Sequence, residues 1–200
     1  MHPRPFTCHT RLAAAALLLL SLVIGACNPY ADRTHIAKAL AVGTQMLAVG
    51  HRDILLVAKG LNAPDGDEKI LRASEVQALI RDRFIYGYDV VALGGLAYVA
   101  ASGAVVAIDY EAPTATVVDF DRLDGNVFAL TYSAPWLLVV VGSTPELSTR
   151  VLSYTIAEDG SLVPAGSRDV IGRRRGLGPS AIASADGVVF LAMSDGKVWR

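Results

Sequence analysis

The residue with the most specific chemical setting in this sequence is Cys27, whose thiol follows two small residues, Gly25 and Ala26. Before them, Leu12 to Ile24 form an uncharged run of 13 residues. A bilayer core of about 30 Å needs about 20 apolar residues to span it, so this run is too short for a membrane helix and suits a cleavable export signal. Because a signal peptidase needs small side chains before the bond that it cuts, we expect residues 1–26 to be removed as a signal peptide.

The residues around the expected cleavage point also match a known pattern. Ile24, Gly25, Ala26 and Cys27 resemble the lipobox of bacterial lipoproteins, in which the thiol is acylated and the Cys becomes the new N-terminus. The resemblance implies acyl chains on Cys27, and two or more such chains hold a protein stably on a membrane. It also implies that residues 27–34 form a lipidated tether. The alternative is an ordinary signal peptide followed by an incidental Cys.

The same resemblance implies a location and a set of partners in the bacterial cell envelope. Asn28 follows the Cys in place of Asp, which in enterobacterial lipoproteins favours transfer to the outer membrane. Removal of the signal peptide leaves 174 residues with 16 basic and 19 acidic side chains. This negative balance predicts no nucleic-acid partner. The expected partners are the membrane, through the lipid on Cys27, and a protein or glycan of the envelope.

A Ser-His-acid arrangement is the catalytic option that the sequence offers. His51 and Asp53 stand two residues apart, so on a strand they would share a face, and Ser143 lies in an expected loop. The chain has no G-x-S-x-G elbow, however, and residues 51–53 are more typical of a polar turn. We therefore predict no catalytic residue and no cofactor.

Two acidic groups could supply oxygen ligands for a calcium ion. One is Asp65 to Glu68, and the other consists of Asp119, Asp121 and the segment Asp124-Gly125-Asn126. Neither keeps the spacing of an EF-type loop, so we expect both to be solvated turns. Outside the signal peptide the one Cys is Cys27, which would carry lipid. The sequence thus predicts no metal site and no disulfide.

Three consecutive cations form a candidate binding loop. Arg173, Arg174 and Arg175 concentrate positive charge between Gly172 and Gly178. The segment lacks the Lys-Ser/Thr of a phosphate-cradling loop and the third Gly of a dinucleotide fingerprint. It could meet an acidic partner or lipid head groups, and the alternative is a solvated connection between strands.

The elements that must position these residues have the pattern of strands. Apolar runs of five to eight residues, rich in Val, Ile and Tyr, recur between Gly, Pro, Asp and Ser. Two of them, Trp136 to Val141 and Val188 to Met193, are apolar throughout, which predicts strands covered on both faces. We expect Trp136 and Trp199 to pack into the core that these strands form.

The strand pattern also repeats along the chain. Gly43, Gly95 and Gly187 each stand three positions before a large residue, and Pro135 marks the same place in a fourth segment. The spacings of 52, 40 and 52 residues are near the 40 to 50 residues of propeller blades. Residues 35–200 are therefore expected to form an all-β, propeller-like domain of about 3.5 four-stranded blade repeats.

Two stretches resemble known propeller repeats. Gly103 to Pro113, GAVVAIDYEAP, resembles the extracellular repeat whose signature contains Val-Ile-Val-Asp. Val151 to Trp199 is similar to the blades of the lactonase-like seven-bladed propellers, a group that includes 6-phosphogluconolactonase; the matching features are Tyr154, the turn 159–162, and Asp186-Gly187. These motifs specify a blade and transfer no catalytic residue to this chain.

Three further predictions concern local structure and completeness. A turn is expected at Ser102-Gly103, between one strand and a second over 104–110. The capping-box form of Ser74 to Gln77 favours a helix over 74–84, the alternative being an outer strand with a long turn. Because propellers close with about four to eight blades, we expect the 200 residues to be a truncated product, with an open or four-unit ring as the alternative.

These observations favour a membrane-anchored, non-enzymatic binding or scaffold module of the bacterial envelope. The alternatives are a lactone or ester hydrolase, by resemblance to the lactonase-like group, and a cell-surface recognition or adhesion protein. A hydrolase would need His51, Asp53 and the loop of Arg173 to Arg175 to converge on one end of the fold.

Overall fold

The computed structural model describes residues 36–50, 53–59, 68–80, 86–143, 148–171, 179–194 and 196–200. All of them belong to the unit that runs from Ile36 to Arg200. The expected lipobox, the tether and the Arg173 to Arg175 loop lie outside the described residues. No helix in the described ranges is long and apolar enough to cross a membrane.

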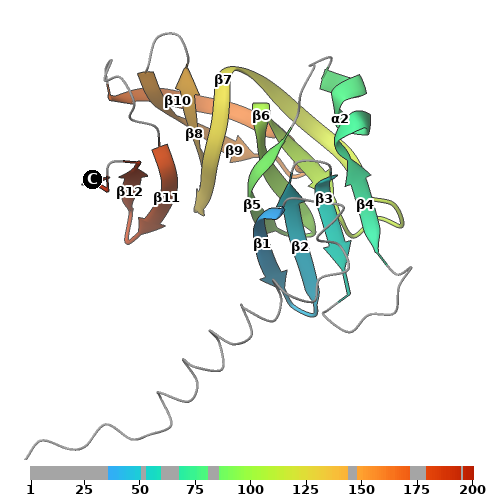
Figure 1. The fold of residues 1–200 in the computed structure, drawn as a ribbon. Coiled ribbons are helices and arrows are strands. Elements are labelled where there is room, and N and C mark those ends of the chain that lie inside the picture. Colours follow the sequence, from blue (N-terminus) through green and yellow to red (C-terminus); the bar gives the residue numbers. More distant parts are fainter. Residues whose placement is uncertain are drawn as a thin grey trace, which may run out of the picture. The chain divides into compact units, whose positions relative to one another are not determined.

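The described chain is almost entirely β-structure, in three antiparallel sheets with one short helix (Figure 1). The strands are β1 Ile36–Val42, β2 Gln45–Gly50, β3 Asp53–Ala58, β4 Lys69–Arg72, β5 Gly87–Leu93, β6 Leu96–Asp109, β7 Thr116–Ser133, β8 Trp136–Ser143, β9 Ser148–Ile156, β10 Leu162–Ile171, β11 Pro179–Ala185, β12 Val188–Met193 and β13 Val198–Trp199, and the helix is α2, Ala73–Ile80. The all-β prediction is confirmed.

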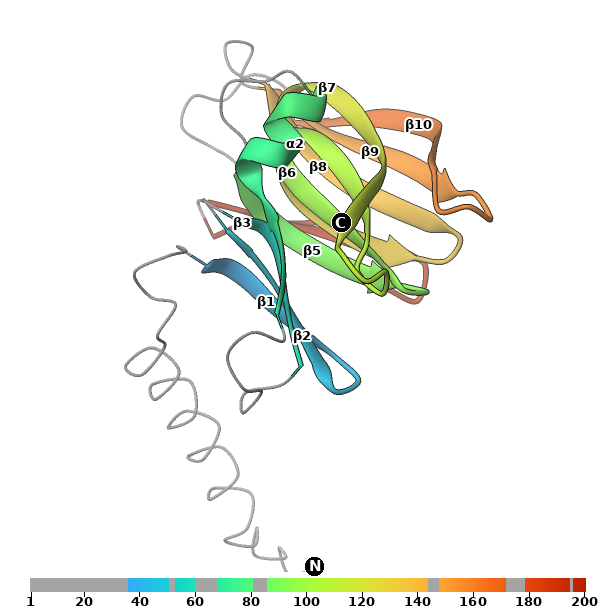
Figure 2. The same cartoon turned by 90° about the vertical axis from the view of Figure 1, so that its right-hand side faces the viewer.

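Each sheet is a meander in which strands pair with their neighbours in the sequence. The orders are β1-β2-β3-β4, then β5 to β10 in one six-stranded sheet, then β11-β12-β13. In Figure 2 the four-stranded sheet stands beside α2 and the six-stranded sheet. Strand β1 also packs against β5, β5 against β7, and β7 against β11, so the three sheets are in contact in sequence order.

The four segments aligned in the sequence occupy equivalent places in these sheets. Gly43, Gly95, Pro135 and Gly187 all lie in two-residue turns, which join β1 to β2, β5 to β6, β7 to β8, and β11 to β12. The three glycines have φ of +58°, +83° and +73°, a region that side chains with a Cβ rarely adopt. The spacing of these residues therefore reflects a recurring hairpin.

The turn predicted at Ser102-Gly103 is confirmed, because β6 folds back on itself there. The backbone N–H of Tyr110 donates to the carbonyl oxygen of Gly95 at 3.3 Å, whereas the two ends of a single extended strand of 14 residues would lie about 45 Å apart. Gly103 has a φ of +75°, which suits a tight turn. The part of β6 up to Ala101 pairs with β5, and the part from Ala104 pairs with β7, so β6 supplies two antiparallel strands.

Apolar side chains fill the spaces between the sheets. One cluster joins the β1–β4 sheet and α2 to one side of β5 and β6, and includes Leu47, Val57 and Val106. A second, which includes Tyr98, Val139 and Tyr154, joins β6 to β7, β8 and β9. A third joins β7 and β8 to β12. Each layer removes apolar surface from water, which is the main favourable term in folding.

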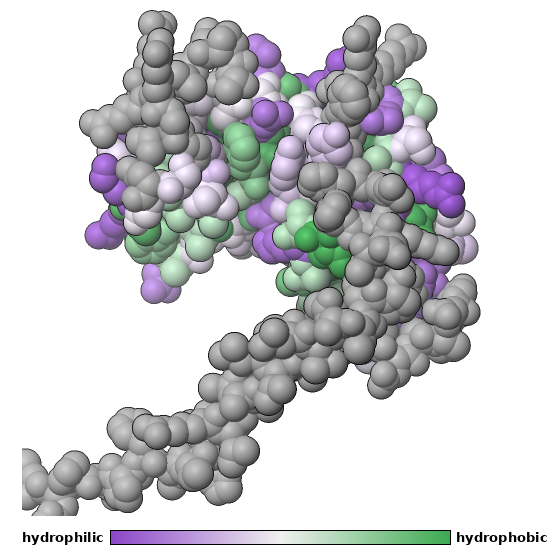
Figure 3. Space-filling view, in the orientation of Figure 1, coloured by the Kyte–Doolittle hydropathy of each residue, from purple (hydrophilic) through white to green (hydrophobic). Residues whose placement is uncertain are grey.

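The prediction of strands covered on both faces holds for β8 and fails for β12. Leu137 to Val141 are all buried, with members of the run in both the second and third clusters. In β12, Leu191 and Met193 are buried, but Phe190 is 37% exposed. Phe190 lies on the outer face of the β11–β13 sheet, on which Ala183 is its directly opposed residue and is exposed too. Figure 3 shows apolar surface over β11 and β12.

The helix predicted over 74–84 is present as α2, although its first turn differs from the prediction. Glu75 reaches back: its carboxylate accepts a hydrogen bond from the backbone N–H of Arg72 at 3.4 Å. Val76 and Ile80 are buried as expected, whereas Leu79 is 54% exposed. The rest of the predicted helix falls outside the described residues.

A buried carboxylate connects three strands from three parts of the chain. Asp89 in β5 is 7% exposed, and its Oδ1 accepts hydrogen bonds from the backbone N–H of Val90 at 2.8 Å and from the ammonium of Lys38 in β1. Its Oδ2 accepts from the backbone N–H of Leu130 in β7 at 3.0 Å. We call these four residues the Asp89 cluster.

Two buried tyrosines make the stability of the fold sensitive to alkaline pH. Burial, followed by the charges of nearby acidic groups, raises the pKa of Tyr98 to about 12, and burial and the Asp121 carboxylate raise the pKa of Tyr154 further. An unfolded Tyr ionises near pH 10. The native state therefore binds more protons than the unfolded state above pH 10, and stability falls as pH rises from there.

We expect the free energy of unfolding to be constant up to about pH 10 and then to fall by up to about 1.4 kcal/mol per pH unit for each buried Tyr. Urea titrations between pH 8 and pH 12 measure this slope. Tyr98→Phe and Tyr154→Phe should each reduce it, because each removes one buried phenol whose pKa is raised. Equal slopes in wild type and Tyr98→Phe would contradict the assignment.

Candidate binding groove between two sheets

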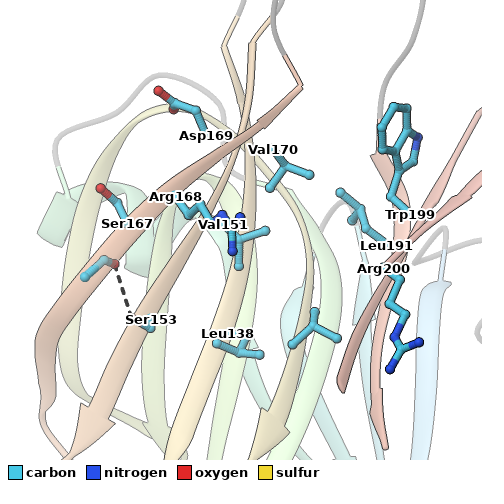
Figure 4. Close-up of a pocket in the computed structure, with 12 residues that line it drawn as sticks. Leu138, Val151, Ser153, Ser167, Arg168, Asp169, Val170, Leu191, Trp199 and Arg200 are labelled. Atoms are coloured by element: carbon cyan, nitrogen blue, oxygen red, sulfur yellow. Dashed lines mark hydrogen bonds between the residues drawn. The ribbon is translucent and has the colours of Figure 1, made fainter. Parts of the chain in front are cut away.

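A groove of about 540 Å³ lies between the outer part of the six-stranded sheet and the β12–β13 hairpin (Figure 4). One wall consists of residues from β8, β9 and β10, including Leu138, Val151 and Arg168. The other consists of residues from β12 and the end of the chain, including Leu191 and Trp199. Its position therefore depends on the packing of two sheets that follow one another in the sequence.

The strand alternation decides which side chains of β10 enter the groove. Arg168 is directly opposed to Val151 on β9, and Val151 to Val140 on β8, so all three share one face of the sheet. Figure 4 shows Arg168 directed into the space between the sheets, whereas Ser167 and Asp169 point to the other side of β10. A single cation of this strand is thus presented to the groove without its acidic neighbour.

The facing wall combines an aliphatic side chain with an indole. Leu191 and Trp199 are directly opposed in β12 and β13 and lie on one face of that hairpin. Leu191 is 3% exposed, but Trp199 is 41% exposed and lines the groove. The expectation that both tryptophans pack into the core is wrong, since Trp136, at the first residue of β8, is 41% exposed as well.

The charged groups in the lining are the guanidinium groups of Arg168 and Arg200 and the carboxylate of Asp169. Within the described part of the chain, neither Arg168 nor Arg200 has a hydrogen bond or an ion pair with another residue. Ser153, also in the lining, donates its hydroxyl hydrogen to the carbonyl oxygen of Gly166 at 3.3 Å. That hydroxyl bridges β9 and β10, and the guanidinium groups remain available to a ligand.

The arrangement is suited to binding. Aliphatic side chains form its floor, an indole forms one side, and two guanidinium groups supply hydrogen-bond donors, which is the usual composition of a small-molecule site. Among the described residues no group of three His, Cys, Asp or Glu side chains could hold a metal ion.

Comparisons with known proteins identify the fold and no family. No protein-family model matches the sequence, and a search of curated proteins found no match. Among solved structures, the computationally designed Ika4 protein is similar with a TM-score of 0.57 and 13% identity, covering 84% of this chain and 91% of that one. Myxococcus xanthus glutaminyl cyclase is similar with a TM-score of 0.50 and 15% identity, covering 82% of this chain and 63% of the cyclase. The fold is propeller-like.

In this propeller-like fold the residues singled out for catalysis belong to different sheets. Asp53 begins β3 in the four-stranded sheet, and Ser143 ends β8 in the six-stranded sheet. His51 lies outside the described residues, as do Ile24, Gly25, Ala26 and Cys27 of the expected lipobox and Arg173, Arg174 and Arg175 of the candidate loop.

The acidic residues Asp119 and Asp121 lie in β7, and the solvated turn expected there is wrong. Asp119 accepts a hydrogen bond from the backbone N–H of Leu162 at 2.7 Å, and Asp121 from the hydroxyl of Tyr154 at 2.8 Å. Their oxygen atoms connect β7 to β9 and β10, which are more than 30 residues away. Of the other acidic group, Glu68 is described, and residues 65–67 are not.

The sequence reasoning missed Arg168 and treated Trp199 as a core residue. The available signal was the pair Arg168 and Asp169, the charged residues of the stretch 160–172, whose side chains alternation along a strand places on opposite faces. Nothing in the sequence shows, however, that this face of β10 is opposed by β12 and β13.

Proposed function

We propose that this chain is a lipid-anchored, non-enzymatic binding module of the bacterial cell envelope. The observation that carries the binding role is the groove of about 540 Å³, which presents Arg168 and Trp199 above an aliphatic floor. The resemblance of Ile24 to Cys27 to a lipobox supports the anchor. In this proposal the lipid on Cys27 fixes the location, and the groove supplies the specificity.

The propeller-like fold is a suitable scaffold for such a role. We take the β1–β4 sheet as one four-stranded blade, and the two-residue hairpins at Gly43, Gly95, Pro135 and Gly187 as the recurring feature of the others. Rigid sheets hold the lining side chains in place, whereas the connecting loops can vary in sequence and length without changing the sheets. The loop of Arg173 to Arg175 is a second point of contact for an acidic partner or for lipid head groups.

Replacing Cys27 with Ala should move the protein out of the membrane fraction of its native host. The reason is that anchoring depends on acyl chains attached to this thiol, each buried CH₂ group contributing about 0.8 kcal/mol. Membrane fractionation with intact-mass measurement checks the result, and wild type should show an acylated Cys27 as its first residue. Cys8→Ala, the same change inside the expected signal peptide, is the matched control and should behave as wild type. A Cys27→Ala protein that stays with the membranes would overturn the anchor.

A further inference from the structure

We propose that the groove binds a small amphiphilic anion, a molecule with one carboxylate-type head and an aliphatic body, and that Arg168 binds the head. This inference rests on the proposed binding role of the groove and names its ligand class. It follows from three properties of the lining, namely its charge, its apolar floor and its volume.

The charge of the groove selects an anion. Arg168 extends into the space between the sheets, and Arg200 lies on the opposite wall (Figure 4). Asp169, the acidic residue in the lining, points to the other side of β10, so it does not neutralise Arg168. A guanidinium group pairs with a carboxylate through two parallel hydrogen bonds. A cationic ligand would be repelled from the same position.

The floor of the groove selects an apolar body. Leu138 is 8% exposed and Leu191 is 3% exposed, and Val151 and Val189 lie beside them. The indole of Trp199 adds a flat apolar surface that is 41% exposed. Apolar ligand surface covered by these residues contributes about 25 cal/mol per Å². A compact hydrated anion such as inorganic phosphate would contact the arginines and leave this floor uncovered.

The volume selects a small molecule over a folded partner. Sites for small ligands have volumes of about 300–1,000 Å³, and the groove has about 540 Å³. A stable protein interface instead covers about 800 Å² on each partner and is commonly flat. A single aliphatic chain with a charged end is the simplest molecule that satisfies the floor and the guanidinium group together.

A matched series of ligands tests the charge and the chain separately. Octanoate, 1-octanol and octyltrimethylammonium share the same eight-carbon chain and differ in the charge of the head. The protein is the full chain in phosphatidylcholine vesicles, carrying Trp136→Phe so that Trp199 is its one tryptophan. We expect a saturable change of Trp199 emission with octanoate. The affinity for 1-octanol should be weaker than that for octanoate by a factor of about ten or more, and the cation should give no saturable change.

Two variants connect the response to the groove. Arg168→Gln should weaken octanoate binding about tenfold and leave 1-octanol unchanged, because it removes charge-assisted hydrogen bonds to the head alone. Arg122→Gln makes the same change at an exposed arginine of β7 that does not line the groove, and it should bind octanoate as the parent does. Circular dichroism of both variants shows that they are folded.

Equal affinity for the three head groups, an equal effect of the two variants, or no saturable response to octanoate would overturn the ligand class. Vesicles that contain phosphatidylglycerol test the source of the anion. Loss of the octanoate response in them would mean that a membrane lipid occupies the groove, and would overturn the inference of a free small molecule. Failure of the anchor is seen separately, in the fractionation of Cys27→Ala, which does not depend on octanoate.

Discussion

Replacing Asp89 with Ala should lower the free energy of unfolding by about 3–5 kcal/mol, mainly because buried hydrogen-bond donors lose their acceptor. The carboxylate is 7% exposed and accepts hydrogen bonds from Lys38 and from the backbone N–H groups of Val90 and Leu130. Without it, two buried N–H groups lose their partner, and each costs about 1–3 kcal/mol. Loss of the ion pair with Lys38 adds less to this cost, because the Lys38 side chain is 41% exposed and its ammonium can be hydrated instead.

The position of this carboxylate explains why a single residue has so large an effect. Lys38 belongs to β1 and Leu130 to β7, so the Asp89 cluster joins the four-stranded sheet to β5 and β7 of the six-stranded sheet. Urea denaturation of Asp89→Ala and Asp109→Ala measures the difference. Asp109 also accepts two backbone N–H groups, from Glu111 and Ala112, but at a turn near the surface. Its loss should cost about 1 kcal/mol. Equal effects of the two substitutions would contradict the role of burial.

Replacing Gly125 with Ala should destabilise the protein by a similar amount, about 3–5 kcal/mol, through strain and overlap together. Gly125 lies within β7 with a φ of +136°, a conformation that residues with a Cβ rarely adopt. An added Cβ would lie 2.7 Å from the carbonyl oxygen of Gly142 and 3.0 Å from Cγ1 of Val141. The oxygen is backbone in the neighbouring strand β8 and cannot move without disturbing the ladder.

Gly43→Ala separates the two contributions. Gly43 also has a positive φ, of +58°, but a Cβ there would meet nothing within 4 Å. It should therefore cost about 1–2 kcal/mol, the conformational term alone. The same urea titration compares both variants, and a Gly125→Ala protein no less stable than Gly43→Ala would show that β7 and β8 can separate without penalty.

The strands themselves could be predicted from the sequence, because a continuous run of Leu and Val such as Leu137 to Val141 is typical of a buried strand. What failed were the places where one residue has two possible uses. Asp119 has the character of a turn residue, yet it lies in β7, where its carboxylate accepts a hydrogen bond from the backbone N–H of Leu162. That contact involves a residue far along the chain.

The candidate site was out of reach for a related reason. Asp121 and Tyr154 are 33 residues apart, and their hydrogen bond turns a residue expected in a solvated turn into a link between strands. Likewise, Arg168 and Trp199 face one groove only because β10 and the β12–β13 hairpin belong to sheets that pack together. Alternation predicts which side chains share a face, whereas the opposing face is a property of tertiary packing.

The meander order of the sheets has a consequence for the time course of folding. Since every strand in the described chain pairs with a neighbour in sequence, each sheet can form from residues already present, without waiting for a distant strand. Chains with mainly local pairing pay little loop-closure entropy and fold quickly for their class. For a polypeptide that emerges from a ribosome or a translocation pore N-terminus first, the β1–β4 sheet can assemble while β11 is still unfolded. The order of emergence can thus be the order of assembly, which shortens the period in which apolar strands are open to aggregation.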